Sequence, residues 1–455
     1  MSKYIYIPIE IKNREFLSKS LLSFFLAKKG YKVILGKSTE IDKMCLLGPK
    51  GVYLGTSIVQ QHRNIFEKLL KRHHHVIAMD EEGLVYYNKE NYMRNRVDTK
   101  TISLLDAFLI WGNHQNELVL SKCPQFDFKL KNIGNIRMEI LKKRYWYLYM
   151  DEVKQIKERY GKFILFNTNF GAFNHYENIE KYIESVKKLV DAGKEDLKFV
   201  NDKIEHQEKV FFCFKNLAIK LKEQLPDYQI VIRPHPSENF DRWREELDGT
   251  GIKVVHEGTV VPWIIASECV VQQNCTTGIE ALCLEKPVIS YLPSYDKRFD
   301  DGLPNRMVPI IDNEKEMVDT IQDLIENKEV WEMILERKRE EDLNNYINNL
   351  EDDKDIFEEY IKIFDEVAFE SSDVERWRLW GGIQKIYESL SFFINKDKRK
   401  NIKYIKQKFS TLKMPELQQL LKISEKNLQI DLKSVQFKKV YNSLYLIYSE
   451  QKNEK

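Results

Sequence analysis

The chain has 455 residues, with 72 Lys and Arg against 70 Asp and Glu, which gives a formal net charge of +2. This length is too great for one ordinary domain and suits two α/β domains with an appendage. The near balance of charge argues against a protein that binds nucleic acid through its overall charge.

The cysteines and the hydropathy pattern narrow the class further. The six cysteines contain no CxxC pair and no cluster with His, which argues against a disulfide framework and a structural zinc site and favours a reducing compartment. Residues 1–10 already include charged side chains, and no long run of apolar residues occurs elsewhere in the chain. We therefore expect neither a signal peptide nor a membrane span, and a cytoplasmic protein.

Predicted strands and helices alternate along the chain, as in parallel βα units. In the first series a strand at 4–9, a helix at 15–30 and a strand at 31–36 lead to strands at 51–54, 75–79 and 107–111. A second series has strands at 162–167, 229–233, 251–255, 269–272 and 287–291, with two helices within residues 175–225. We predict an α/β protein of GT-B architecture, in which Rossmann-like domains at residues 1–155 and 156–350 face a cleft.

Residues 351–455 are predicted to form a helical crossover and a C-terminal helical appendage, because the Gly and Pro residues that punctuate βα units nearly vanish. Within the appendage, the segment Lys396–Lys408 is strongly basic with interleaved apolar residues. Two interpretations stay open for this segment. It is either a surface for the inner face of the membrane or for a partner, or a solvated helix face.

The most informative motif is Arg233-Pro234-His235-Pro236, which closes an apolar strand. Parallel sheets bind ligands at the carboxyl ends of their strands, and the two prolines make the loop stiff. The guanidinium of Arg233 and the imidazole of His235 therefore suit a phosphate.

A second motif follows the strand at 269–272. Thr276 and Thr277 are expected at a helix N-terminus, where free N–H groups face an anion, and Gly278 would allow close backbone approach. Glu280, one helical turn in, could accept hydrogen bonds from ribose hydroxyls. Asn167 and Asn169, which follow the first strand of this domain, either line the same site or form an ordinary turn.

In the first domain, the strand at 75–79 runs into Asp80-Glu81-Glu82-Gly83. A carboxylate in this loop could act as a general base on an acceptor hydroxyl. Asp300-Asp301-Gly302 is a second, lower-ranked acidic match in the other domain. The triplet His73-His74-His75 has no carboxylate or Cys at ligand spacing, so we predict no metal site.

These motifs together resemble the bacterial surface carbohydrate biosynthesis proteins, which are related to capsule Kdo transferases and more distantly to bacterial sialyl- and polysialyltransferases. The resemblance rests on Glu81-Glu82-Gly83 preceded by Asp80, on His235-Pro236 and on Thr276-Thr277, and it spans residues 1 to about 350. It implies a CMP-activated sugar as donor, an acidic motif that supplies the base, and an HP histidine that contacts the CMP phosphate. The base stays open among Asp80, Glu81 and Glu82, with Glu82 preferred.

The sequence thus predicts an inverting glycosyltransferase that moves a nonulosonic acid or Kdo-type sugar from a CMP-sugar, which is a substrate rather than a cofactor, to a surface glycan or glycoprotein. The 1–155 domain would serve the acceptor and the 156–350 domain the donor, without a metal, a further cofactor or nucleic acid. The alternatives are a GT-B transferase that uses a UDP-sugar, a GDP-sugar or a CDP-alcohol, and a non-catalytic scaffold of a glycan assembly complex at the inner membrane face.

Overall fold

The computed structural model describes residues 2–86, 88–191, 196–350, 355–371 and 409–450. The chain divides into two compact units. The first unit comprises Met1–Leu84, Lys89–Leu148 and Asn344–Lys455, and the second comprises Val85–Asn88 and Tyr149–Leu343. The main part of the second unit is therefore one continuous segment, after which the chain returns to the first unit.

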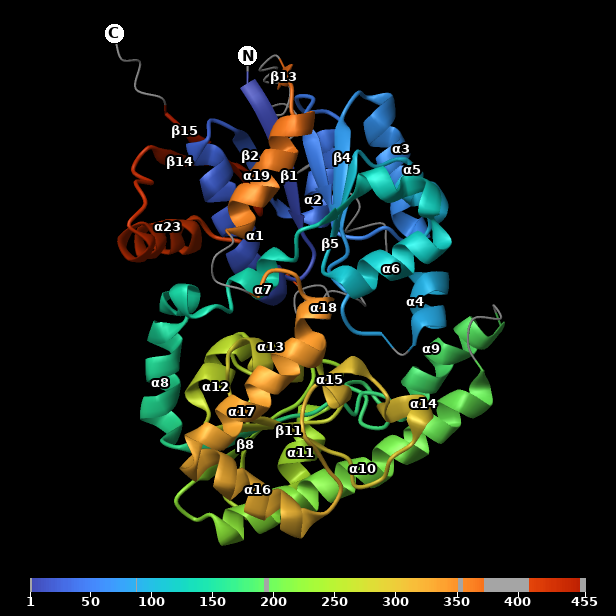
Figure 1. Ribbon diagram of the computed structural model, residues 1–455, viewed down its shortest axis with the longest axis vertical. Helices are drawn as coiled ribbons and strands as arrows, with labels where there is room; N and C mark the ends of the chain where they lie inside the picture. The colour runs from blue at the N-terminus through green and yellow to red at the C-terminus, as the bar shows by residue number, and fades with distance from the viewer. Residues whose placement is uncertain (1, 87, 192–195, 351–354, 372–408, 451–455) are drawn as a thin grey trace, which may run out of the picture. The chain divides into compact units, whose positions relative to one another are not determined.

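A largely parallel sheet forms the core of the first unit (Figure 1). Its described strands are β1 (Ser2–Ile9), β2 (Lys32–Lys37), β3 (Val52–Gly55), β4 (His75–Met79), β5 (Ala107–Ile110), β6 (Leu130–Asn132), β13 (Glu370–Ser371), β14 (Val435–Tyr441) and β15 (Leu444–Ser449). They lie in the order β14-β15-β2-β1-β3-β4-β5-β6, and β13 pairs with β1. Strands β1 to β6 are parallel, and the buried apolar runs of β1 to β5 are typical of strands covered on both faces.

The helices of the first unit follow the βα alternation. They are α1 (Lys12–Lys28), α2 (Ser38–Cys45), α3 (Arg63–Lys71), α4 (Lys89–Asn95), α5 (Thr99–Ser103), α6 (Asn113–Lys122), α7 (Ile136–Glu139), α18 (Asn344–Tyr346), α19 (Ile356–Val367) and α23 (Met414–Leu428), with short 3₁₀ turns at Gln60–His62, Pro124–Lys129 and Lys143–Leu148. None of the helices described in either unit is long and apolar enough to cross a membrane.

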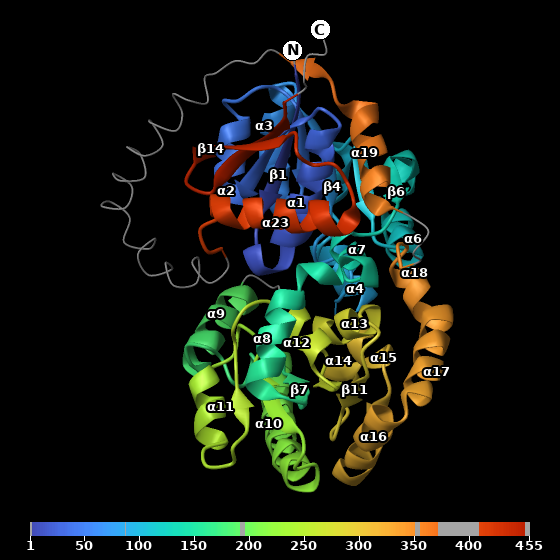
Figure 2. The same cartoon turned by 90° about the vertical axis from the view of Figure 1, so that its left-hand side faces the viewer.

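The prediction of a purely helical appendage is wrong for its last part. Helix α23 packs against α1 (Figure 2), but β14 and β15 form an antiparallel hairpin that extends the first sheet, with β15 antiparallel to β2. These segments are rich in β-branched and aromatic residues, and β15 pairs with the free side of β2, which overrides the surrounding helical pattern. The basic segment Lys396–Lys408 lies outside the described residues.

The second unit has its own parallel sheet. Its strands are β7 (Phe163–Asn167), β8 (Gln229–Arg233), β9 (Lys253–Val254), β10 (Cys269–Gln272), β11 (Val288–Tyr291) and β12 (Ile310–Ile311). The order β12-β11-β10-β7-β8-β9 is that of a Rossmann sheet, in which the chain changes direction between the first and fourth strands, here β7 and β10.

The helices of the second unit include both helices that were predicted within residues 175–225. They are α8 (Met150–Tyr160), α9 (Ile179–Asp191), α10 (Leu197–Gln224), α11 (Phe240–Glu246), α12 (Val260–Ala266), α13 (Thr276–Cys283), α14 (Lys297–Asp300), α15 (Leu303–Arg306), α16 (Glu314–Glu326) and α17 (Lys328–Lys338), with a π-helical turn at Arg339–Leu343. The long helix α10 packs against β8 and α16.

Candidate functional site

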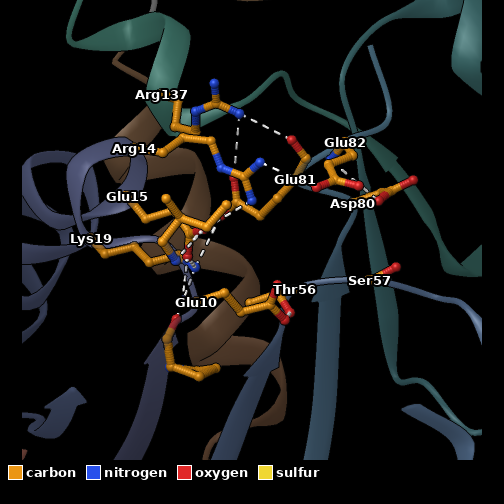
Figure 3. A network of polar contacts seen from close by, with 12 residues as sticks. Glu10, Arg14, Glu15, Lys19, Thr56, Ser57, Asp80, Glu81, Glu82 and Arg137 are labelled. Atoms are coloured by element: carbon orange, nitrogen blue, oxygen red, sulfur yellow. Dashed lines mark hydrogen bonds and ion pairs between the residues drawn. The ribbon is translucent and has the colours of Figure 1, made fainter. Parts of the chain in front are cut away.

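The acid loop, residues Asp80–Gly83, directly follows β4 of the first unit. The neighbouring strands β1 and β3 are where the sheet order changes direction, so their carboxyl ends border the crevice in which such sheets bind ligands. Polar side chains gather there (Figure 3), and the Thr56 hydroxyl after β3 donates to the Glu10 carboxylate after β1. The acid loop thus belongs to a larger polar network.

The three acids of the loop lie in different environments. Asp80 is fully buried, forms an ion pair with Arg96 and accepts a hydrogen bond of 3.2 Å from the Tyr92 hydroxyl. Glu81 is buried, and its Oε1 lies 3.0 Å from Lys19 Nζ. The side chain of Glu82 is 53% exposed, which makes it the acid of the three that an acceptor hydroxyl can reach.

Glu82 lies between two guanidinium groups. Its carboxylate oxygens are 3.3 Å from Arg14 Nη1 and 2.9 Å from Arg96 Nη1. Figure 3 shows Glu82 and Arg14. Two cations at these distances favour the ionised carboxylate, which is the form that a general base needs. They also fix the direction in which the side chain points.

A buried ion cluster contacts the acid loop through the ion pair between Lys19 and Glu81. Lys19 is fully buried and donates to the Pro8 carbonyl and to Glu15, both at 2.8 Å. Glu15, on the same face of α1, also accepts the backbone N–H groups of Glu10 and Ile11 at 3.0 and 3.1 Å. Burial by itself would raise the pKa of Glu15, but the charges of Lys19 and Arg14 and these hydrogen bonds together lower it to about 2.

The HP loop, residues Arg233–Glu238, follows β8 of the second unit. His235 is exposed, and its Nδ1 lies 3.2 Å from the backbone N of Ser237 and 2.7 Å from the Ser237 hydroxyl. Because a backbone N–H can only donate, Nδ1 is an acceptor, and a neutral ring then carries its proton on Nε2. The loop therefore presents Nε2–H as a donor with a fixed ring orientation.

Glu238, which the sequence analysis missed, holds this loop together. Its buried carboxylate accepts hydrogen bonds from His235 N (3.0 Å), the Thr168 hydroxyl (2.6 Å) and Trp243 Nε1 (2.9 Å). Among the described residues, no Lys or Arg lies within ion-pair distance of it, and burial raises its pKa. Its only sequence signal is its position three residues after His235.

Arg233 is engaged elsewhere. Its guanidinium donates to the carbonyls of Glu257 at 2.7 Å and Gly258 at 2.8 Å, and it is buried next to Trp263. Burial lowers its pKa to about 10, against the opposing effect of nearby carboxylates such as Glu152. We assign it the role of holding the loop after β9 beside the HP loop.

Helix α13 begins next to this region at Thr276. Cys275 is its N-cap and makes no side-chain capping hydrogen bond, so Thr276 and Thr277 occupy the first helical positions rather than the cap. Close packing favours a glycine at position 278, because a Cβ there would lie 3.0 Å from Gln272 Cδ on β10. Glu280 is half-buried one turn into the helix.

The two candidate asparagines lie at the end of β7. Asn167 is buried, and Asn169 donates from Nδ2 to the Asn274 carbonyl after β10 at 3.0 Å. This bond spans the point where the Rossmann order changes direction, so the carboxyl ends of β7, β8 and β10 meet. A pocket of about 240 Å³ opens there, and Asn169, Ser237 and Asn274 are among the residues that line it.

The second acidic candidate, Asp300, is not placed as a base. It is buried, lies 2.9 Å from His206 Nε2 and accepts a hydrogen bond of 2.8 Å from Gln273 Nε2. Its carboxylate thus supports the wall of the same pocket. Within the described residues, no group of three or more His, Cys, Asp and Glu side chains could hold a metal ion.

No protein family model matches this sequence, and no curated protein matches it either. Solved structures do match. UDP-GlcNAc 2-epimerase from Neisseria meningitidis, bound to UDP-GlcNAc, has a TM-score of 0.51 at 12% identity over 80% of this chain and 100% of that chain. The wall teichoic acid polymerase TagF, soaked with CDPG, has a TM-score of 0.50 at 13% identity over 80% and 88% of the two chains.

At these identities the likeness shows the fold. The chain is an α/β protein of GT-B type, as the sequence predicts. The positions of the site residues rest on the geometry described above.

Proposed function

We propose that this chain is a GT-B glycosyltransferase that transfers a sugar from a nucleotide-activated donor to a surface glycan or glycoprotein. The observation that carries the proposal is the HP loop, where the ring of His235 is fixed through Nδ1 and presents Nε2–H at the carboxyl edge of a Rossmann sheet. A fixed donor of this kind stabilises the charge that builds on a departing phosphate. The N-terminal amides of α13, where Thr276 and Thr277 lie, would add further donors to the same anion.

The acceptor would be activated in the first unit. Glu82 is exposed and lies between Arg14 and Arg96, so it is our choice of general base among the three acids. It would take the proton of the acceptor hydroxyl while that oxygen attacks the anomeric carbon of the sugar. The bond between this carbon and the phosphate oxygen breaks as the nucleotide departs, which inverts the configuration.

For the donor, we favour a CMP-sugar of a nonulosonic acid or Kdo type, which rests on the resemblance of the three motifs. The alternative is a UDP-sugar, a GDP-sugar or a CDP-alcohol. Of the two solved structures named above, one is bound to UDP-GlcNAc and the other is soaked with CDPG, so this alternative is equally compatible with the fold. A scaffold without catalysis leaves the fixed His235 and the exposed Glu82 without a use.

The test combines nucleotide binding with turnover. CMP, CDP, UMP, UDP and GDP are compared by thermal shift, since a ligand that binds only the folded state raises its apparent stability. Then CMP release from CMP-Kdo and CMP-nonulosonates is measured for His235→Ala and Glu82→Gln. We expect either change to lower kcat by about 100-fold or more, and Glu82→Gln to leave CMP binding unchanged.

His73→Asn and Glu117→Gln are the matched controls. Both residues are exposed and lie away from the candidate loops, and the positive φ of His73 (62°) is one that Asn tolerates. Preference for UDP or GDP would move the assignment to the alternative donors. Wild-type turnover in His235→Ala would overturn the role of the HP loop, and no response to any nucleotide would favour the scaffold.

A further inference from the structure

The pocket beside the HP loop has a lining that suits an anion. It is enclosed by the end of β7, the HP loop, the loop after β10 and helices α9 and α10. Among the described residues, its lining side chains include Lys203 and two histidines, His175 and His206, but no Asp or Glu. Burial lowers the pKa of His175, and Lys203 is the lysine of this lining.

A carboxylate that contacts the lining, that of Asp300, already has partners. Asp300 lies 2.9 Å from His206 Nε2, and it also accepts hydrogen bonds from Gln273 Nε2 and from the backbone N of Asp296, both at 2.8 Å. The carboxylate of Asp300 therefore has His206, Gln273 and the backbone N–H of Asp296 as its partners. The amide and hydroxyl groups of Asn169, Gln273 and Ser237 complete a polar lining.

The wall of the pocket is preformed. Gln207, one residue after His206 on α10, accepts the backbone N–H groups of Ala172 and Phe173 at 2.9 and 3.2 Å and donates to the Asn169 carbonyl at 3.0 Å. All the polar atoms of this side chain are thus used to fix the loop after β7 to α10. A preformed site loses little entropy when a ligand binds.

The pocket is connected to the His235 ring through Ser237. Ser237, which lines it, makes the 2.7 Å hydrogen bond to His235 Nδ1. Gly171, another lining residue, allows this approach, because a Cβ there would lie 2.2 Å from the Ser237 hydroxyl oxygen. The pocket therefore borders the Nδ1 side of the ring whose Nε2–H is the proposed phosphate donor.

We propose that this pocket binds a second anionic group of the donor, adjacent to the phosphate at His235, with Lys203 as the cation that selects it. The inference rests on the proposed function and deepens it. Two donor classes carry such a group: the carboxylate of a CMP-linked sugar acid, and the β-phosphate of a nucleoside diphosphate donor. The insertion that contains α9 and α10 would then have a function, because it brings Lys203 to the site.

The test compares the dissociation constants of four ligands by calorimetry in wild type, Lys203→Ala and Lys209→Ala. The ligands are CMP, CDP, a CMP-nonulosonate and the carboxyl methyl ester of that CMP-nonulosonate. Lys209 is exposed on the same helix and does not line the pocket, so its variant is the control. We expect one second anion to give at least about ten-fold tighter binding than CMP, and Lys203→Ala to remove this gain while CMP binding stays unchanged.

The ligand series separates the two sources. A gain for CDP assigns the pocket to a β-phosphate, whereas a gain for the CMP-nonulosonate that its ester lacks assigns it to the sugar carboxylate. A gain that survives Lys203→Ala, or no gain from either anion, would overturn this inference and leave the nucleotide assignment standing. If no nucleotide binds wild type, the proposed function fails and the inference with it.

Discussion

The acid loop follows strand β4 of one unit and the HP loop follows strand β8 of the other, and both are fixed by a buried carboxylate. Below the acid loop, Glu15 is held by the cations Lys19 and Arg14. In the HP loop, Glu238 is held by neutral N–H and O–H donors. The same problem, orienting one side chain at a strand end, is thus solved once with charges and once without.

The difference follows from what each loop has to present. A general base such as Glu82 must be ionised, and a network rich in cations favours that state. A phosphate donor such as His235 must offer an N–H, and neutral hydrogen bonds orient the ring without placing a compensating charge beside it. The two networks should therefore respond differently when one charge is removed.

Lys19→Met is the change with the largest expected effect. It leaves Glu15 and Glu81 buried with the arginines as their remaining cationic partners, so we expect the free energy of unfolding to fall by about 3 kcal/mol. Urea denaturation measures the loss. Lys28→Met is the control, because Lys28 is exposed near the end of the same helix and its loss should matter by less than about 0.5 kcal/mol. A loss of under about 1 kcal/mol for Lys19→Met would contradict a network held by charge.

The pH dependence of that loss sharpens the comparison. The pKa of Glu15 is lowered from 4.5 to about 2 in the folded state, so its ionised form stabilises the fold above pH 4.5, and this contribution is lost as the pH falls towards 2. The advantage of wild type over Lys19→Met should therefore shrink by about 1–2 kcal/mol between pH 6 and pH 3. Denaturation of both proteins at the two pH values checks this, and a constant difference would show that Lys19 acts through packing.

The sequence predicted the parts of both loops that depend on local pattern. Apolar runs placed the strands, and the motifs that interrupt them placed His235 and the acids Asp80 to Glu82 at strand ends. The partners that decide the role of each residue come from distant segments. Lys19 reaches Glu81 across more than sixty residues, and Arg233 is turned to Glu257 and Gly258.

The error at the C-terminal hairpin has the same origin. Strand β15 pairs with β2, some four hundred residues earlier in the chain, and β14 pairs with β15, so no local pattern reports the pairing. The state of both strands depends on tertiary contacts, which override local preference. The assignment of Gly278 as a ligand contact stays a prediction, and the structure adds that a side chain there would meet Gln272 on the neighbouring strand.

Glu238→Gln should have the smallest effect of these changes on the free energy of unfolding. It tests whether the HP loop depends on the charge of Glu238. The amide keeps the shape and one acceptor but turns an NH₂ group towards donors, which costs stability. Against this, the raised pKa of Glu238 shows that its ionised form carries a burial cost at neutral pH, and Gln does not. We expect a net loss of about 1 kcal/mol in the free energy of unfolding. Glu245→Gln, at an exposed position in α11, is the control and should change little. A loss as large as that of Lys19→Met would mean that the Glu238 charge is itself essential, and the contrast between the two loops would fail.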